Sequence, residues 1–267
     1  SGARRLRLVS ATTLVVASML GTGVFTTSGF LLADLRSPWL VLLAWLVGGV
    51  LAACGALSYG ALARRLPESG GEYLFLSRTL HPAAGVMAGW ISILVGFAAP
   101  MAAAAIAFGE YLSDWFPGIS PQWLGSALLF SLALLHALRM EGGNRLHNVT
   151  VGVELVLIVV FVVLALSRLP AEAVLQTVPN GGSPAAFAVG LLWVSFSYYG
   201  WNAAVYVAGE VRDPERTLPR ALLLGTALVT LLYLALNAAF VFAAPWQLLA
   251  GETDIGRVAA RALGGPL

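Results

Sequence analysis

The chain has 267 residues, of which 59% are hydrophobic and 10% are charged, and its formal net charge is +2. This composition excludes an ordinary soluble domain, and apolar runs of about 20 residues recur along the chain, as in proteins with several membrane-spanning helices. The single cysteine, Cys54, excludes an internal disulfide and a site with several cysteine ligands. With three well-separated histidines, we expect no metal centre. We also expect no cofactor and no nucleic-acid partner, although the net charge itself does not bear on nucleic-acid binding.

Seven apolar segments predict seven membrane-spanning helices. The third is long enough to require a tilt in the bilayer, and Pro100 inside it should kink the helix. Pro214 and Pro219 are expected to end the sixth segment and to open the seventh. The rest of the chain, 244–267, is expected to be a loop with a short amphipathic helix near 256–263. The seven segments are 8–33, 39–62, 83–112, 123–138, 149–166, 185–207 and 221–243.

The basic residues are all arginines, and they are distributed unevenly between the ends of the predicted helices. Cytoplasmic loops of membrane proteins carry an excess of basic residues. If the N-terminus lies inside, every arginine falls on the cytoplasmic side except Arg36, Arg168, Arg257 and Arg261. We therefore expect a cytoplasmic N-terminus and an external segment 244–267.

The first apolar segment is interrupted at its centre by two glycines, Gly21 and Gly23, on either side of Thr22. Glycine inside a helix costs about 1 kcal/mol relative to alanine. A break at bilayer depth is tolerated only where protein buries it or where it lines a cavity. Such a break exposes N–H groups that can hold an anion and carbonyl groups that can hold a cation. Alternatively, the glycines allow close helix packing.

The sixth apolar segment has a second candidate interruption, where polar and aromatic residues surround Gly200 within 196–202. An aromatic belt at the membrane interface is the alternative, but the cluster begins about ten residues after the start of the segment. The two interrupted segments are five apart. Paired interruptions in corresponding positions of two halves are typical of transporters whose binding site lies between the halves.

Three stretches resemble the amino acid–polyamine–organocation (APC) superfamily of transporters. Residues 18–25 resemble the glycine signature of its first helix, and 67–73 resemble its first cytoplasmic loop. Residues 196–202 and 209–221 resemble its sixth helix and the loop that follows. The pattern is closest to the L-type and related bacterial amino acid permeases. The resemblance therefore implies that the chain crosses a bacterial cytoplasmic membrane many times.

The resemblance also implies the fold class, an all-α multi-pass membrane protein with the LeuT-type 5+5 inverted repeat. Helices 1 and 6 of that fold are unwound at mid-membrane. Residues 8–168 would form the first five-helix repeat of a single membrane domain, 1–267, and 184–243 would form the first two helices of the second repeat. Because the core of this fold has ten helices, we expect the chain to be an N-terminal fragment of a longer permease, truncated to about seven helices.

For an α-amino acid substrate, the resemblance assigns both charged groups to backbone atoms of the two breaks. The carboxylate would meet N–H groups at the start of the outer half of the first helix, and the ammonium would meet free carbonyls of Met19, Phe196 and Tyr199. Phe196 and Trp201 are candidates for the gate and the pocket wall, with ordinary packing as the alternative. Tyr199 stands where relatives often carry glycine and would favour small substrates. The expected substrate-binding residues are Met19, Gly21, Thr22, Gly23, Val24, Phe196, Ser197, Tyr199 and Trp201.

Glu154 lies in the fifth apolar segment, where sodium-independent relatives commonly carry a lysine. A carboxylate inside a membrane segment indicates a function in proton coupling or in a cation site. Alternatively, Glu154 is hydrated near the cytoplasmic end or is paired with Arg139 or Arg145. Asn237, in the seventh segment, is expected to be satisfied by neighbouring helices.

We therefore expect a secondary amino acid transporter that works by exchange or proton symport. Its partners would be an amino acid, the lipid bilayer and, for a symporter, protons. One alternative is a transporter of amines or polyamines from the same superfamily. Another is a seven-helix receptor or channel that does not transport, although the arginine distribution places the N-terminus on the wrong side for a receptor. No convergent nucleophile and base indicate an enzyme.

Overall fold

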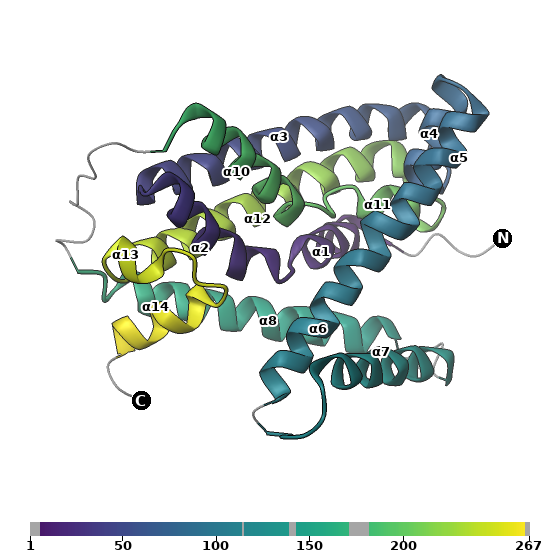
Figure 1. The fold of residues 1–267 in the computed structure, drawn as a ribbon. Helices are drawn as coiled ribbons and strands as arrows, with labels where there is room; N and C mark the ends of the chain where they lie inside the picture. Colours follow the sequence, from purple (N-terminus) through teal and green to yellow (C-terminus); the bar gives the residue numbers. More distant parts are fainter. Residues whose placement is uncertain (1–5, 114, 139–142, 171–181, 265–267) are drawn as a thin grey trace. The chain divides into compact units, whose positions relative to one another are not determined.

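The computed structural model describes residues 6–113, 115–138, 143–170 and 182–264 (Figure 1). These residues form helices joined by loops. Leu6 and Val211 pair in an isolated β-bridge. The chain folds as two compact units, each treated by itself below: Ser1–Ser69 together with Glu154–Leu267, and Gly70–Val153.

The first predicted span is two helices in the structure. Helix α1 (Leu8–Met19) and helix α2 (Gly23–Leu35) meet at a bend of 45°. Helix α3 (Pro38–Arg65) follows, with Pro38 at its first position and with the Ser37 hydroxyl accepting the Leu40 N–H at 3.4 Å. Serine before the first turn and proline within it are typical of a helix start.

The sixth predicted span is also divided, because its first helix ends at Ser197 and the next begins at Ala203. The seventh predicted span begins earlier than expected, at Pro214, so Pro219 lies inside the helix and the prediction that it precedes the helix is wrong. The predicted amphipathic helix near 256–263 is α14. The elements are α10 (Pro184–Ser197), α11 (Ala203–Tyr206), a 3-10 turn η2 (Ala208–Glu210), α12 (Pro214–Val241), α13 (Trp246–Leu249) and α14 (Ile255–Gly264).

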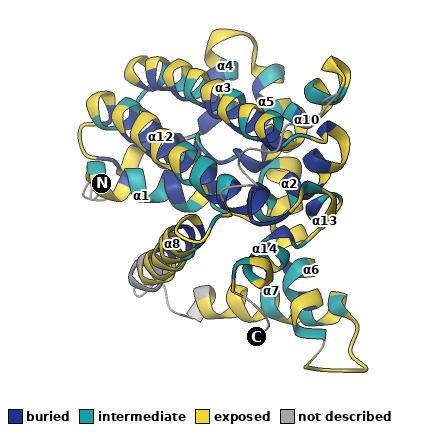
Figure 2. Ribbon diagram, turned by 90° about the vertical axis from the view of Figure 1, so that its left-hand side faces the viewer, coloured by how far each residue is buried: buried dark blue, intermediate teal, exposed yellow. Residues whose placement is uncertain are grey.

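The core of the first unit, Ser1–Ser69 with Glu154–Leu267, is built around α3 and α12. These two helices lie side by side, and α1 packs against α12 (Figure 1). Glycines allow these helices to approach closely: a Cβ on Gly60 would lie 3.1 Å from the Cα of Pro219, and one on Gly225 would lie 2.6 Å from Val15 Cγ1. Small residues at such crossings are typical of membrane helix packing. Buried residues line the inner faces of these helices, whereas α8 is exposed along most of its length (Figure 2).

The second unit contains the third and fourth predicted spans. Its long apolar helix carries a π-helical segment directly before Pro100, where Ala99 N–H bonds to the Leu94 carbonyl. Proline lacks an N–H, and helices accommodate such a loss through local changes of hydrogen bonding. The short helix α4 was expected to be loop. The elements are α4 (Gly71–Thr79), α5 (Pro82–Ile91), η1 (Ser92–Ala98), α6 (Ala99–Ser113), α7 (Pro121–Leu138) and α8 (Gly143–Leu166), the last of which continues into the first unit.

Each of the seven predicted segments coincides with apolar helix, and the chain is a multi-pass membrane protein. The bent pair α1 and α2 is long and apolar enough to cross a membrane if it counts as one span. Two segments, Pro121–Leu135 and Pro184–Ser197, are shorter apolar helices. Four helices reach the required length and hydropathy by themselves: Pro38–Arg65, Pro82–Ser113, Val149–Leu166 and Pro214–Val241.

Candidate functional site

The two helix interruptions contact each other at two points. At the first, a Cβ on Gly23 would lie only 2.7 Å from the Ser197 hydroxyl oxygen. At the second, Gly200 lies against the Ser18 carbonyl with a φ of 113°. An L residue with a side chain rarely adopts this φ, and a Cβ would also collide with the carbonyl. The contact at Gly200 therefore requires glycine, whereas a side chain at Gly23 would require Ser197 to shift.

The start of α2 offers backbone donors. In the part of the chain that the structure describes, the N–H groups of Thr22, Gly23 and Val24 have no acceptor, while the Phe25 N–H bonds to the Thr22 carbonyl at 3.0 Å. Gly21 and Thr22 are exposed, and Val24 is 1% exposed. The first N–H groups of a helix lack intrahelical partners and lie at the positive end of its dipole. This arrangement suits a carboxylate.

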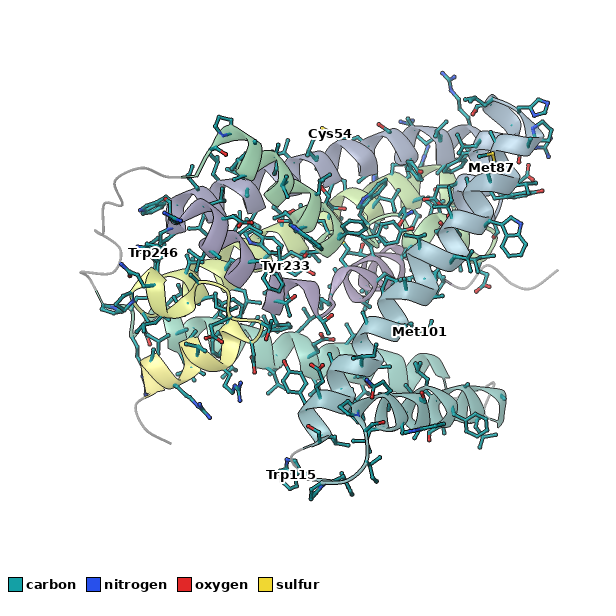
Figure 3. The ribbon with its side chains drawn as sticks, viewed as in Figure 1. Cys54, Met87, Met101, Trp115, Tyr233 and Trp246 are labelled. Carbon is teal, nitrogen blue, oxygen red and sulfur yellow. The ribbon has the colours of Figure 1, made fainter. Side chains whose placement is uncertain are left out.

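The carbonyl groups expected to be free already accept hydrogen bonds. Tyr233 on α12 donates its hydroxyl to the Met19 carbonyl at 2.5 Å, and the same hydroxyl is 3.3 Å from the Ser197 carbonyl (Figure 3). The Phe196 carbonyl accepts the Tyr199 N–H at 3.1 Å. The expectation of unpartnered carbonyls at Met19 and Phe196 is therefore wrong. A carbonyl has two lone pairs, so each can accept a second donor.

The aromatic residues of the second interruption point in different directions. Phe196 is 67% exposed. Trp201 packs on α3, where its ring centroid is 4.8 Å from that of Tyr59 and where a Cβ on Gly55 would lie 2.6 Å from its ring. Tyr198 is buried and donates its hydroxyl to the Trp45 carbonyl at 3.0 Å. Trp201 thus packs extensively on α3, as expected if its role is ordinary packing.

Glu154 lies on α8 and is half-buried. Within the described residues no ion pair involves it. Of its two expected partners, Arg139 lies outside the described residues, and the side chain of Arg145 is outside them as well. Its pairing with either arginine therefore stays a prediction.

The segment before α1 is tied to the chain that follows the second interruption. Leu6 donates its N–H to the Glu210 carbonyl at 3.1 Å and accepts the Arg212 N–H at 2.9 Å. These two bonds form a parallel bridge between Leu6 and Val211. Close by in sequence, the Gly209 N–H donates to the Ser69 hydroxyl at 2.8 Å. Backbone bonds thus join the ends of the two interrupted spans.

Comparison with known proteins decides the family. The family model described as amino acid permease matches residues 6–267. This chain belongs to the amino acid permease family. The match confirms the resemblance to the APC superfamily that the three stretches indicated.

Three relatives of this permease are transporters, not enzymes. The b(0,+)-type amino acid transporter 1 of Mus musculus is 28% identical over 261 residues, which are 93% of this chain and 53% of the relative. The large neutral amino acids transporter small subunit 2 of Mus musculus is 30% identical over 263 residues, 93% and 50% of the two chains. The serine/threonine exchanger SteT of Bacillus subtilis (strain 168) is 28% identical over 241 residues, 89% and 55%. The permease chain thus spans about half the length of these relatives.

Several polar residues around the interruptions were not singled out from the sequence. Tyr198 adjoins the predicted Tyr199, yet it is Tyr198 whose side chain is buried and bonded to α3. Tyr233 lies in the middle of an apolar helix, and its position there is the only sequence signal that could have indicated it. A buried polar side chain in an apolar span is expected to have a hydrogen-bond partner, so it predicts a contact but does not identify the partner.

Proposed function

We propose that this permease is a secondary transporter of α-amino acids that works by alternating access in a cytoplasmic membrane. The observation that carries the proposal is the contact between the two helix interruptions, through Gly23 with Ser197 and Gly200 with Ser18, in a chain of the amino acid permease family. Paired interruptions of this kind supply both an anion site and a cation site without charged side chains. The printed names of the three relatives support an amino acid as the substrate.

In this proposal the carboxylate binds the N–H groups of Thr22, Gly23 and Val24, with Gly21 allowing close approach. The lack of acceptors for these three N–H groups among the described residues supports the assignment. Val24 contributes only its backbone, because its side chain is 1% exposed.

The ammonium would bind the second lone pairs of carbonyls at Met19 and Phe196, together with the carbonyl of Tyr199. Ser197 shapes this end of the site through its contact with Gly23. Phe196 would cover the bound amino acid, since its ring is exposed and adjoins the interruption. Trp201 would form the wall on the α3 side, where it packs.

The proposed architecture is the LeuT-type inverted repeat, with 8–168 as the first repeat and 184–243 as the start of the second. The interruptions in the first and sixth spans, five spans apart, support this assignment. The N-terminus would be cytoplasmic and 244–267 external.

Glu154 is proposed as the group that couples uptake to protons. Its half-burial on α8, within an apolar helix long enough to span a membrane, supports this role. Glu154→Gln, which cannot ionise, is expected to abolish the dependence of uptake on external pH. Glu110→Gln, at an exposed position on α6, serves as the matched control and should keep it. An unchanged pH dependence in Glu154→Gln would refute the coupling role.

Counterflow tests the transport function. The complete gene product is reconstituted in proteoliposomes loaded with one unlabelled amino acid, and uptake of the same radiolabelled amino acid is followed. A carrier gives a transient accumulation above that of protein-free liposomes, because exchange proceeds through one site, whereas a channel gives none. Accumulation with amines or polyamines but with no amino acid would establish the alternative substrate class. No accumulation with any of them would refute the proposal.

A further inference from the structure

A continuous chain of buried hydrogen bonds runs through α2, α3 and α12. The indole Nε1–H of Trp45 donates to the Ser28 hydroxyl at 2.8 Å, and Ser28 donates in turn to Oδ1 of Asn237. The Asn237 amide nitrogen then donates to the Tyr233 carbonyl at 2.8 Å. The side chains of Trp45, Ser28 and Asn237 are all 0% exposed. This set is called the Ser28 network below.

The direction of every bond in the Ser28 network is fixed. The Tyr233 carbonyl can only accept, so the Asn237 amide nitrogen faces it and the amide oxygen faces Ser28. Ser28 therefore donates its proton to Asn237 and accepts from the indole N–H of Trp45, which can only donate. Each buried polar group in the series has its partner, and loss of any member leaves another unsatisfied in an apolar interior.

The Ser28 network meets the substrate site through α2. Ser28 is on the same helix as Gly23, within two turns of the helix start. Thr27 adds a second attachment, because its hydroxyl lies 2.9 Å from that of Ser197. The orientation of the first turn of α2, and of its N–H groups, therefore depends on bonds made by the neighbouring side chains.

Helix α12 holds both sides of the first interruption from residues one turn apart. Tyr233 bonds the Met19 carbonyl at the end of α1, and Asn237 bonds Ser28 on α2. The bond from Asn237 to the Tyr233 carbonyl joins the two attachments. Helix α12 thus bonds to both α1 and α2, and loss of the Ser28 hydroxyl would remove its bond to α2.

We propose that the Ser28 network is a positioning device that aims the N–H groups of the first turn of α2 at the substrate carboxylate. Ser28 and Asn237 are its positioning residues; neither touches the substrate. The inference rests on the proposed function, since it concerns the carboxylate site of that proposal. It predicts that the network controls discrimination between substrates with and without a carboxylate, beyond any effect on stability.

The test compares the best-transported amino acid with its amide as competitors of counterflow in the complete gene product. Wild type is expected to prefer the acid, and Ser28→Ala is expected to reduce the ratio of the two affinities by about tenfold, the size of a lost buried hydrogen bond. Ser28→Cys keeps a weak donor and acceptor in a slightly larger side chain, so it should give an intermediate ratio.

The matched control is Thr226→Val on α12. The Thr226 hydroxyl is also buried, but it has no hydrogen-bond partner among the described residues, so its removal should leave the ratio at the wild-type value. A wild type that does not prefer the acid would refute the proposed function and this inference with it. A wild type that prefers the acid, with variants Ser28→Ala and Ser28→Cys that keep its ratio, would refute the inference alone.

Discussion

The two halves of the interrupted first span are held by different kinds of contact. Helix α1 packs on α12 and is also held by backbone groups, through the bridge from Leu6 to Val211 and the approach of Gly200 to the Ser18 carbonyl. Helix α2 is fixed by side-chain hydrogen bonds, from Ser28 to α3 and α12 and from Thr27 to α10. The comparison teaches that the second interrupted span holds α1 through backbone groups, whereas α2 depends on side-chain hydrogen bonds to three helices. The predictions below test this difference.

The largest effect is expected at Gly200, on the backbone side of the comparison. Gly200→Ala should prevent folding or abolish counterflow, because a residue with a Cβ is strained at this φ of 113° and would collide with the Ser18 carbonyl. Thermal unfolding in detergent and counterflow measure the two outcomes. Gly152→Ala is the matched control, since a Cβ there meets nothing within 4 Å, and it should not destabilise the protein. Wild-type stability and counterflow in Gly200→Ala would show that α1 does not depend on this contact.

A smaller but substantial effect is expected at Gly23, the first residue of α2, where the proposed carboxylate site lies. Gly23→Ala should weaken amino acid binding by about tenfold or more, because its Cβ would lie 2.7 Å from the Ser197 hydroxyl and would displace the start of α2. Competition in counterflow measures the affinity. Gly23→Leu should abolish binding. Retention of wild-type affinity by Gly23→Ala would contradict the assignment of the carboxylate to this helix start.

A third effect is expected from the hydrogen bond that Tyr233 donates to the last residue of α1. Tyr233→Phe should cost about 1 kcal/mol of stability and weaken amino acid binding several-fold, because the Met19 carbonyl loses its donor. Tyr198→Phe is the matched control: it removes an equivalent bond to the Trp45 carbonyl, away from α1, so it should lower stability without the same loss of affinity. Equal loss of affinity in both variants would show that the bond to Met19 has no special role.

The smallest effect is expected from a covalent link between the two segments that pair at Leu6 and Val211. Cys54 is the one cysteine of these 267 residues and is exposed on α3 (Figure 3), so Cys54→Ser removes it from the background for Leu6→Cys with Val211→Cys. Paired positions of a bridge lie within the range of a disulfide. If α1 moves with the second interrupted span, oxidation should change counterflow less than about twofold. Inhibition that a reductant reverses would instead show that the two segments separate during transport.

The positions of the helices followed from the sequence because a membrane span needs about 20 apolar residues, and such runs are unmistakable. Gly21, Gly23 and Gly200 also predicted where the helices stop, since glycine is costly within a helix. The expectation that neighbouring helices satisfy Asn237 is confirmed by its bonds with Ser28 and Tyr233.

The identity of the partners did not follow from the sequence. Nothing in the spacing of Ser28, Trp45 and Asn237 connects them, because they lie on three helices whose neighbours are set by the tertiary fold. The helical position of Pro219 was missed for a similar reason: it lies inside α12 and packs against Gly60 on α3, a tertiary contact that the local sequence does not show. The roles assigned to the substrate-binding residues stay predictions.

The most direct test of the central claim is the affinity of the wild-type protein for one amino acid, its amide and the corresponding decarboxylated amine. The account predicts that the amide and the amine each bind at least about tenfold more weakly than the acid, because both leave the N–H groups at the start of α2 without an anion. Equal affinity for all three would contradict the claim that the paired interruptions form an amino acid site.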